Sequence, residues 1–251
     1  LVLTGPLRPR TAVEAVLKRG KVKVCGTPTT QWNMLLKSGE RVHVNVARAV
    51  HVFRHPRLRL VYEDDDILVV NKGYGLLSVS TDNVKEGTAY SILRDYVKWS
   101  NPANKIFIVH RLDRDTSGLM VFAKNIKAKE ALQHNWNNMV LERKYLAVVE
   151  GIPDCESDTI RSYLTENARH EVYSTDVKGE GQLAVTRYAT LMKGKGRAML
   201  EVDLDTGRKN QIRVHMKEMG HPIVGDRRYG AGVSPIHRLA LHARTLRFVH
   251  P

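Results

Sequence analysis

The stretch His110-Arg-Leu-Asp-Arg-Asp-Thr-Ser-Gly118 runs directly into the apolar segment Leu119–Ala123, and it decides the fold. The first stretch has the composition of a turn, whereas the apolar segment is typical of a buried strand. A carboxylate in this position, Asp113 or Asp115, would be presented by a loop that is set on a strand. Judged by composition alone, such an aspartate most often only shapes the turn, so the loop by itself does not establish a catalytic role.

Segments with strand composition recur on both sides of this loop. They are Leu60–Glu63, Ile67–Asn71, Leu119–Ala123, Lys144–Val149, Leu183–Met192 and Arg197–Asp203. Because these segments do not alternate regularly with helices, they predict an α+β fold with a mainly antiparallel mixed sheet rather than a parallel, doubly wound one. We expect this domain to span residues 59–251 and to be joined by a linker at 47–58 to a smaller module.

Three helices are expected between the strands: Ala89–Val97, Lys127–Met139 and Asn210–Met219. Asn125 is a suitable N-cap for the second helix, and Leu132, Trp136 and Met139 form its apolar side. The third helix should stop at Gly220, which is followed closely by a proline.

Residues 1–46 are expected to form a small basic α/β module. Thr11 and Glu14 have the spacing of a capping box, and the short helix that they open should end at Gly20. Two strands follow in which valines alternate with polar or basic residues, Lys21–Val24 and Arg41–Val46. A helix this short needs the strands as packing partners, so the module should share one small core.

The charge of the chain is strongly positive and unevenly distributed. The formal net charge is +14, and residues 1–58 hold eleven Lys and Arg against two Glu. Positive charge concentrated near one end of the chain favours binding to a polyanion, since each neutralised phosphate releases condensed counterions. We therefore expect contacts with a polyanion at Lys18, Arg19, Lys21 and Lys23, while a basic face that only serves solubility stays an open alternative.

Several functional classes are disfavoured by missing motifs. The dinucleotide, P-loop, serine-hydrolase and zinc-protease signatures do not occur, so we expect neither a cofactor nor a metal. Cys25 and Cys155 are isolated, which fits a reducing compartment. No apolar run approaches the roughly 20 residues of a membrane span. A cytoplasmic monomer without a membrane partner is the expectation.

The stretch at 110–118 resembles the signature of the RluA-type RNA pseudouridine synthases. Further blocks resemble that family in the family's order: Glu63–Lys72, Glu142–Tyr145, Thr206–His215, His221–Asp226 and Arg238–Ala243. The resemblance covers about residues 60–251. The basic module is similar to the small RNA-binding domain that a small-subunit ribosomal protein shares with tyrosyl-tRNA synthetases, and the chain is expected to begin inside it.

The resemblance implies roles for individual residues. Asp113 matches the catalytic aspartate, which acts on the target uridine while its glycosidic bond breaks and re-forms at carbon 5. Arg213 matches the arginine that pairs with this aspartate, and a bidentate guanidinium would keep the carboxylate ionised. Tyr145 matches a tyrosine that packs on the uracil ring and is a candidate for removing the proton from carbon 5. Asn210 departs from the family, which commonly has His there, and this should change a hydrogen bond near the site.

Three further cations are implied to contact RNA. Arg111 matches an arginine that fills the gap left when the base is flipped out of the RNA. Arg208 and Lys72 could bind phosphate, although a plain solvated cation is an equal alternative for both. The implied function is isomerisation of uridine in structured RNA, with large-subunit ribosomal RNA as the first expectation and tRNA as the second. A non-catalytic RNA-binding or ribosome-assembly protein on the same scaffold is the alternative.

Overall fold

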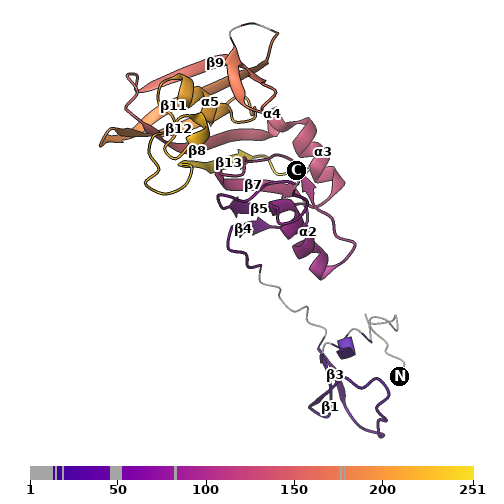
Figure 1. Ribbon diagram of the computed structural model, residues 1–251. Helices are drawn as coiled ribbons and strands as arrows, with labels where there is room; N and C mark the ends of the chain where they lie inside the picture. Colours follow the sequence, from indigo (N-terminus) through magenta and orange to yellow (C-terminus); the bar gives the residue numbers. More distant parts are fainter. Residues whose placement is uncertain are drawn as a thin grey trace. The chain divides into compact units, whose positions relative to one another are not determined.

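The computed structural model describes residues 14, 16–18, 20–45, 53–81, 84–175, 177 and 179–251. The chain divides into two compact units, residues 1–51 and 52–251 (Figure 1). The predicted capping residue Thr11, the predicted RNA contact Arg19 and the linker positions 47–52 lie outside the described residues.

The first unit contains a short helix whose C-terminal end is well defined. The backbone N–H of Gly20 donates to the carbonyl of Leu17 at 2.8 Å, and that of Lys21 donates to Val16 at 3.1 Å. Gly20 has a φ of +64°, the left-handed conformation that this double hydrogen bond requires at the residue after a helix. The predicted helix end is therefore confirmed.

Three short strands complete the first unit: β1 (Val22–Val24), β2 (Thr27–Thr29) and β3 (Val42–Val44). β1 lies in the middle and pairs antiparallel with both neighbours. Val22 and Val24 are buried, whereas Lys23 between them is exposed, as the alternation predicted. Lys18 is also exposed and Lys21 is half-buried.

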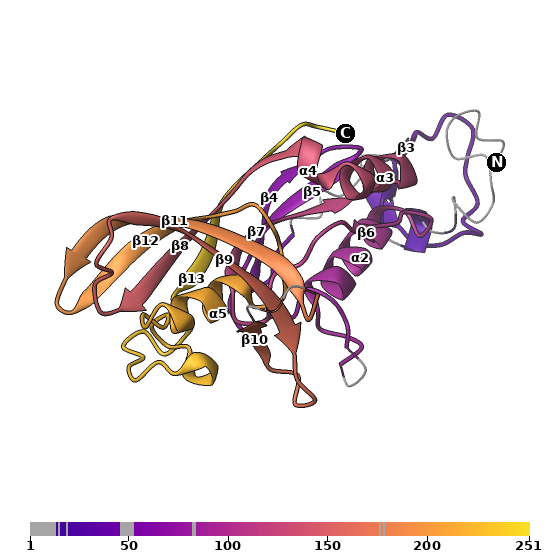
Figure 2. The same ribbon diagram turned by 90° about the horizontal axis from the view of Figure 1, so that it is seen from above.

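The second unit is built on one ten-stranded sheet (Figures 1 and 2). The strands in spatial order are β10 (Val172–Thr175), β9 (Ser157–Glu166), β11 (Gln182–Gly194), β12 (Arg197–Leu204), β8 (Val140–Glu150), β13 (Leu241–Phe248), β7 (Ser117–Ala123), β5 (Ile67–Lys72) and β4 (Leu58–Glu63), with β6 (Phe107–Ile108) pairing beside β7. Every ladder among the described residues is antiparallel except β7–β13. The predicted α+β class is confirmed.

Helices cover both faces of the β4–β5–β7 part of the sheet (Figure 2). Leu68 and Val70 of β5 pack in the cluster that contains helix α2 (Ala89–Ser100). Ile67 of β5 packs instead in the cluster of Leu132, which belongs to helix α3 (Ile126–His134). Since alternate residues of a strand point to opposite faces, α2 and α3 must lie on opposite sides of the sheet.

Helix α5 (Gln211–Glu218) packs on the other half of the sheet. Its residues Ile212 and Met216 join a core with Ala147 of β8 and Leu200 of β12. The helix begins and ends within one residue of the predicted bounds, Asn210 and Met219, and it is followed by Gly220 at φ +82°. This packing places the N-terminal end of α5 beside β8, where the predicted site residue Tyr145 lies.

The segment predicted as one helix over Lys127–Met139 is helical on both sides of Asn135 but is not continuous. α3 ends at His134, Asn135 adopts a non-helical conformation (φ −111°, ψ 25°), and a separate turn of helix, α4 (Trp136–Met139), follows. Asn135 and the later asparagines are weak helix formers, because their short polar side chains compete for the backbone. The break changes the direction of Trp136 relative to Leu132.

Candidate active site

A cavity of about 610 Å³ lies in the second unit. Its lining comes from the loop before β7, from α3 and α4, from β8, from residues 204–213 and from Leu241. The structure thereby gathers five of the predicted site residues around one space: Arg111, Asp113, Tyr145, Arg208 and Arg213. Lys72 does not line this space, and Lys18, Lys21 and Lys23 belong to the other unit.

The loop that carries Asp113 is fixed where it enters β7. Gly118 has a φ of +125°, and a Cβ added there would lie 2.3 Å from the carbonyl oxygen of Ala243 on the parallel neighbour β13. The hydroxyl of Ser117 lies 2.9 Å from Nδ1 of His242 and accepts a hydrogen bond from Arg238 at 3.0 Å. β13 therefore determines where the loop ends, and only glycine permits the close approach.

Lys72 anchors the same loop from the inside, and the prediction that it binds RNA phosphate is wrong. The side chain is fully buried, and its ammonium donates to the carbonyls of Gly73 at 3.0 Å, Leu76 at 2.8 Å and Arg114 at 3.0 Å. All three N–H bonds are thus used by backbone oxygens. Burial lowers the pKa of Lys72 to about 8, against the attraction of Asp115 and Asp113.

The Asp113 carboxylate lines the cavity and accepts no side-chain or backbone hydrogen bond within the described part of the chain. Burial raises its pKa, and four cations oppose that rise. In order of effect these are Arg213, Arg111, Lys72 and Lys209. A carboxylate in such a field is held by charge rather than by fixed donors, so its oxygens stay available to a bound substrate.

Arg213 reaches this site in a different way from the one predicted. Its bidentate partner is Asp226, with Nε–Oδ2 at 2.7 Å and Nη2–Oδ1 at 2.8 Å, and not Asp113. Nη1 donates to the side-chain oxygen of Asn210 at 3.0 Å, so the residue that departs from the family contacts the guanidinium directly. Asp226 orients Arg213, and the positive charge then acts on Asp113 through space.

Tyr145 stands in the cavity wall as a neutral phenol. Burial raises its pKa to about 12, with Arg143 opposing the rise and Asp113 adding to it. At neutral pH the hydroxyl is therefore a donor, and the ring offers a flat apolar face to a base. Because the pKa is so high, almost no phenolate is present at neutral pH to accept a proton, which favours packing and hydrogen bonding as the main contribution of Tyr145.

The remaining predicted residues occupy the surface around the site. Arg111 is exposed, and Arg208 is exposed while its Nε donates to the carbonyl of Leu183 at 3.0 Å. Asp115, the rival carboxylate, pairs with Arg114 at 3.3 Å and does not line the cavity. The turn itself is closed by the N–H of Thr116, which donates to the carbonyl of Asp113 at 3.2 Å.

The sequence indicated no site role for three residues that the structure brings to the cavity or its arginine: Trp136, Arg143 and Asp226. Arg143 and Asp226 both stand in blocks that resemble the family, and this was the signal that could have marked them. The sequence pattern places Trp136 on the apolar side of one continuous helix, because nothing in it indicates the break at Asn135.

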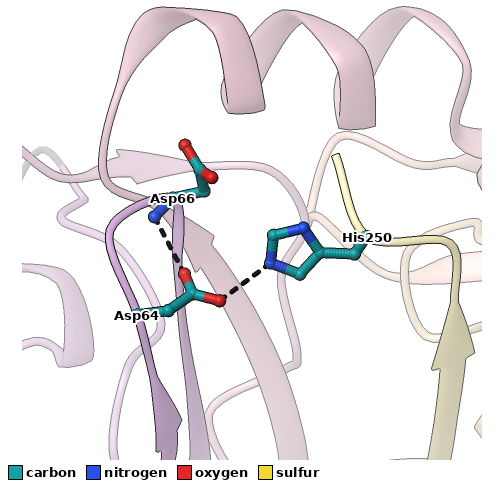
Figure 3. A group of neighbouring side chains, drawn as sticks. All are labelled: Asp64, Asp66 and His250. Carbon is teal, nitrogen blue, oxygen red and sulfur yellow. Dashed lines mark hydrogen bonds and ion pairs between the residues drawn. The ribbon is translucent and has the colours of Figure 1, made fainter.

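A second cluster of polar groups consists of Asp64, Asp66 and His250 (Figure 3). Both oxygens of Asp64 already accept hydrogen bonds, including 2.8 Å contacts from the N–H of Asp66 and from Nε2 of His250. Burial raises the pKa of Asp64, but the hydrogen bonds that its carboxylate accepts, led by the one from the N–H of Ile67, lower the pKa further than burial raises it. The cluster therefore connects the β4–β5 turn to the segment after β13, with both carboxylate oxygens of Asp64 occupied by protein donors.

The cavity thus presents a carboxylate without fixed donors between several cations and an aromatic ring. The family model for RNA pseudouridylate synthase matches residues 66–218, and the chain belongs to that family. It is therefore an RNA pseudouridine synthase, of the RluA type that the motifs indicated. No helix in the described ranges is long and apolar enough to cross a membrane.

Individual relatives agree with this assignment. YhcT of Bacillus subtilis, an uncharacterized RNA pseudouridine synthase, is 34% identical over 87% of this chain and 74% of its own length. Ribosomal large subunit pseudouridine synthase D of Xylella fastidiosa is 36% identical over 77% of the chain and 62% of its own length. Among solved structures, human RNA pseudouridylate synthase domain containing 1 is similar with a TM-score of 0.60 at 28% identity, covering 77% of this chain and 79% of that one.

Proposed function

We propose that this enzyme isomerises uridines of large-subunit ribosomal RNA, with Asp113 as the catalytic carboxylate. The observation that carries the proposal is the carboxylate itself, which lines a cavity among four cations and has no hydrogen bond of its own in the described residues. Relatives named ribosomal large subunit pseudouridine synthase D, at 33–36% identity, support the choice of RNA.

The reaction needs a carboxylate and a ring-sized space in the same cavity. Isomerisation breaks the bond between ribose carbon 1′ and uracil N1 and forms a bond between carbon 1′ and carbon 5. The proton on carbon 5 leaves to solvent and N1 gains a proton, so the change is balanced without an oxidant or reductant. Asp113 acts at the sugar or ring while the bond is open, and Tyr145 packs on the detached ring.

A uridine inside a helix cannot reach Asp113, so the base has to be flipped out of the RNA. Arg111 is exposed next to Asp113 and is suited to occupy the vacated space. Arg208 also lines the cavity and is exposed, so it is suited to a backbone phosphate. We further assign general RNA affinity to the module 1–46, through Lys18, Arg19, Lys21 and Lys23. Action as a cytoplasmic monomer stays a prediction.

The substrate is tested by mapping pseudouridines in cells that have or lack the protein. We expect specific sites to vanish from large-subunit ribosomal RNA and tRNA sites to stay unchanged. Loss of tRNA sites alone would reject the ribosomal assignment while leaving the enzyme class intact. Purified protein should also release tritium from RNA labelled at uracil carbon 5, and an inactive protein that still binds RNA would favour the non-catalytic alternative for this chain.

A further inference from the structure

Trp136 is placed against the reaction cavity rather than in the core. Leu132, one helical turn earlier, is fully buried, and Met139 packs against the same core. Trp136 lies between them in sequence, yet it is not part of that cluster, is partly exposed and lines the cavity that holds Asp113. The break after α3 therefore delivers a large aromatic ring to the cavity wall.

The indole is held in place by two neighbours. The ring of His110 lies 4.9 Å from it between centroids, tilted by 38°, and the guanidinium carbon of Arg143 lies 6.0 Å from its centroid. Nε2 of His110 accepts the N–H of Val121 at 3.0 Å, and burial lowers the pKa of this histidine to about 3, so the ring is neutral. Arg143 also donates to the carbonyl of Leu204 at 3.0 Å. A ring fixed in this way loses little conformational freedom when a ligand contacts it.

The same wall offers hydrogen-bonding groups that are not used within the protein. Among the described residues, the indole N–H of Trp136 and the side-chain amide of Asn137 have no hydrogen-bond partner, although both residues line the cavity. Amphipathic rings with a polar tip are typical of binding surfaces for unpaired nucleotides. Arg208, which also lines the cavity, supplies an exposed positive charge.

We propose that Trp136 binds the nucleotide adjacent to the target uridine by stacking on its base, with Asn137 contacting the edge of that base. This inference rests on the proposed function and extends it from the reacting uridine to its neighbour. The target uracil needs only the part of the cavity at Asp113 and Tyr145, which leaves the wall at α4 for a second base. Stacking on an aromatic ring accepts any base, while the amide of Asn137 can favour particular base edges.

The first test uses the fluorescence of the indole. Replacing Trp32 and Trp99, which do not line the cavity, by Phe leaves Trp136 as the sole tryptophan of the chain. Titration with a short oligouridylate, with binding followed independently by anisotropy of a labelled strand, should quench the Trp136 emission in step with binding. Binding without any change in that emission would overturn the proposal.

The second test measures catalysis on an RNA that the native protein modifies. We expect Trp136→Ala to raise KM about tenfold, a moderate loss for a base stacked on an aromatic ring, and to change kcat little. Trp136→Phe should restore KM, and removal of the neighbouring base from the RNA should abolish the difference between Trp136→Ala and the native protein. If Trp136→Ala keeps the native KM, or lowers kcat equally on the intact and the abasic RNA, Trp136 has only a structural role in the cavity wall and does not bind the neighbouring base.

The failure of the proposed function would look different. If the native protein releases no tritium although the oligouridylate quenches the Trp136 emission, the proposed function is wrong and the nucleotide-binding surface remains supported.

Discussion

Asp113 lies in an environment that pulls its pKa in opposite directions. Burial raises the pKa, and the charges of Arg213, Arg111, Lys72 and Lys209 limit the rise. Since Arg213 is already engaged in a bidentate pair with Asp226, its position does not depend on Asp113. The carboxylate can therefore change partners during a reaction without releasing the arginine.

The pH dependence of tritium release should reflect the opposing effects of burial and nearby positive charge on the pKa of Asp113. In the proposed mechanism the carboxylate acts when ionised, so tritium release should fall as the pH drops through a pKa that lies above the ordinary aspartate range. Arg111→Gln removes one opposing charge, which should move the acidic limb to higher pH by a fraction of a unit to about one unit. Arg94→Gln on α2, which does not line the cavity, is the matched charge control. An acidic limb that moves equally in both variants would contradict the assignment.

Lys72 makes a prediction about stability. Lys72→Met removes the donor of three backbone carbonyls, and we expect the free energy of unfolding to fall by about 2 kcal/mol, typical of acceptors left unpaired. The folded-state pKa of about 8 is below the unfolded value of 10.5, so between these values the unfolded chain binds more protons. The free energy of unfolding of the native protein should then rise with pH across this window relative to Lys72→Met, as measured by urea titration. A constant difference would show that the ammonium is not desolvated.

Among the secondary-structure elements, the junction between β7 and β13 positions the loop of Asp113. Gly118→Ala introduces a Cβ 2.3 Å from the carbonyl oxygen of Ala243 at a φ of +125°, which requires backbone movement. We expect a loss of about 3 kcal/mol and a larger proportional loss of activity, because the loop moves with the strand. Gly194→Ala, in a position with open space and an ordinary φ, is the control and should stay near native in thermal unfolding. Equal behaviour of the two variants would contradict the close-packed junction.

The sequence predicted most elements that have a clear period or a continuous apolar run, but it missed strands that have neither. The segments at Ile67–Asn71 and Leu119–Ala123 are strands because both faces are buried and apolar. β9 has polar residues at most positions, and β13 shows no unbroken alternation of apolar and polar residues. Both carry little local signal and are stabilised by their neighbours in the sheet. The topology of the sheet also brings Leu241 of β13 to the cavity.

The candidate site was predictable only where the family signature names a residue. Asp113, Tyr145 and Arg213 line one cavity as the resemblance implied. The burial of Lys72 and the pairing of Arg213 with Asp226 could not be predicted from the sequence. The carbonyl of Arg114 and the carboxylate of Asp226 are brought to these side chains by the fold and not by a local pattern. A family motif specifies which residue types occur, whereas the hydrogen-bonding partners of their side chains are determined by how the fold packs.

For the molecule as a whole, the positive charge of the first unit should act on RNA binding rather than on chemistry. Lys18→Gln with Lys23→Gln removes two exposed cations, and the slope of log affinity against log salt should become shallower by roughly 0.7–0.9 for each phosphate that is no longer neutralised. Lys105→Gln with Lys98→Gln in the second unit removes equal charge away from the cavity lining. Filter binding at several salt concentrations measures the slopes. Equal slopes for the two pairs would assign the effect to net charge alone.

The proposed chemistry depends on the carboxylate of residue 113 and not on its neighbour two positions later. Asp113→Asn and Asp115→Asn are isosteric changes in one loop, and only the first residue lines the cavity. With RNA labelled at uracil carbon 5, we predict no tritium release from Asp113→Asn at near-native RNA affinity and substantial release from Asp115→Asn. Release by Asp113→Asn, or loss of RNA binding together with its activity, would contradict a catalytic role for Asp113.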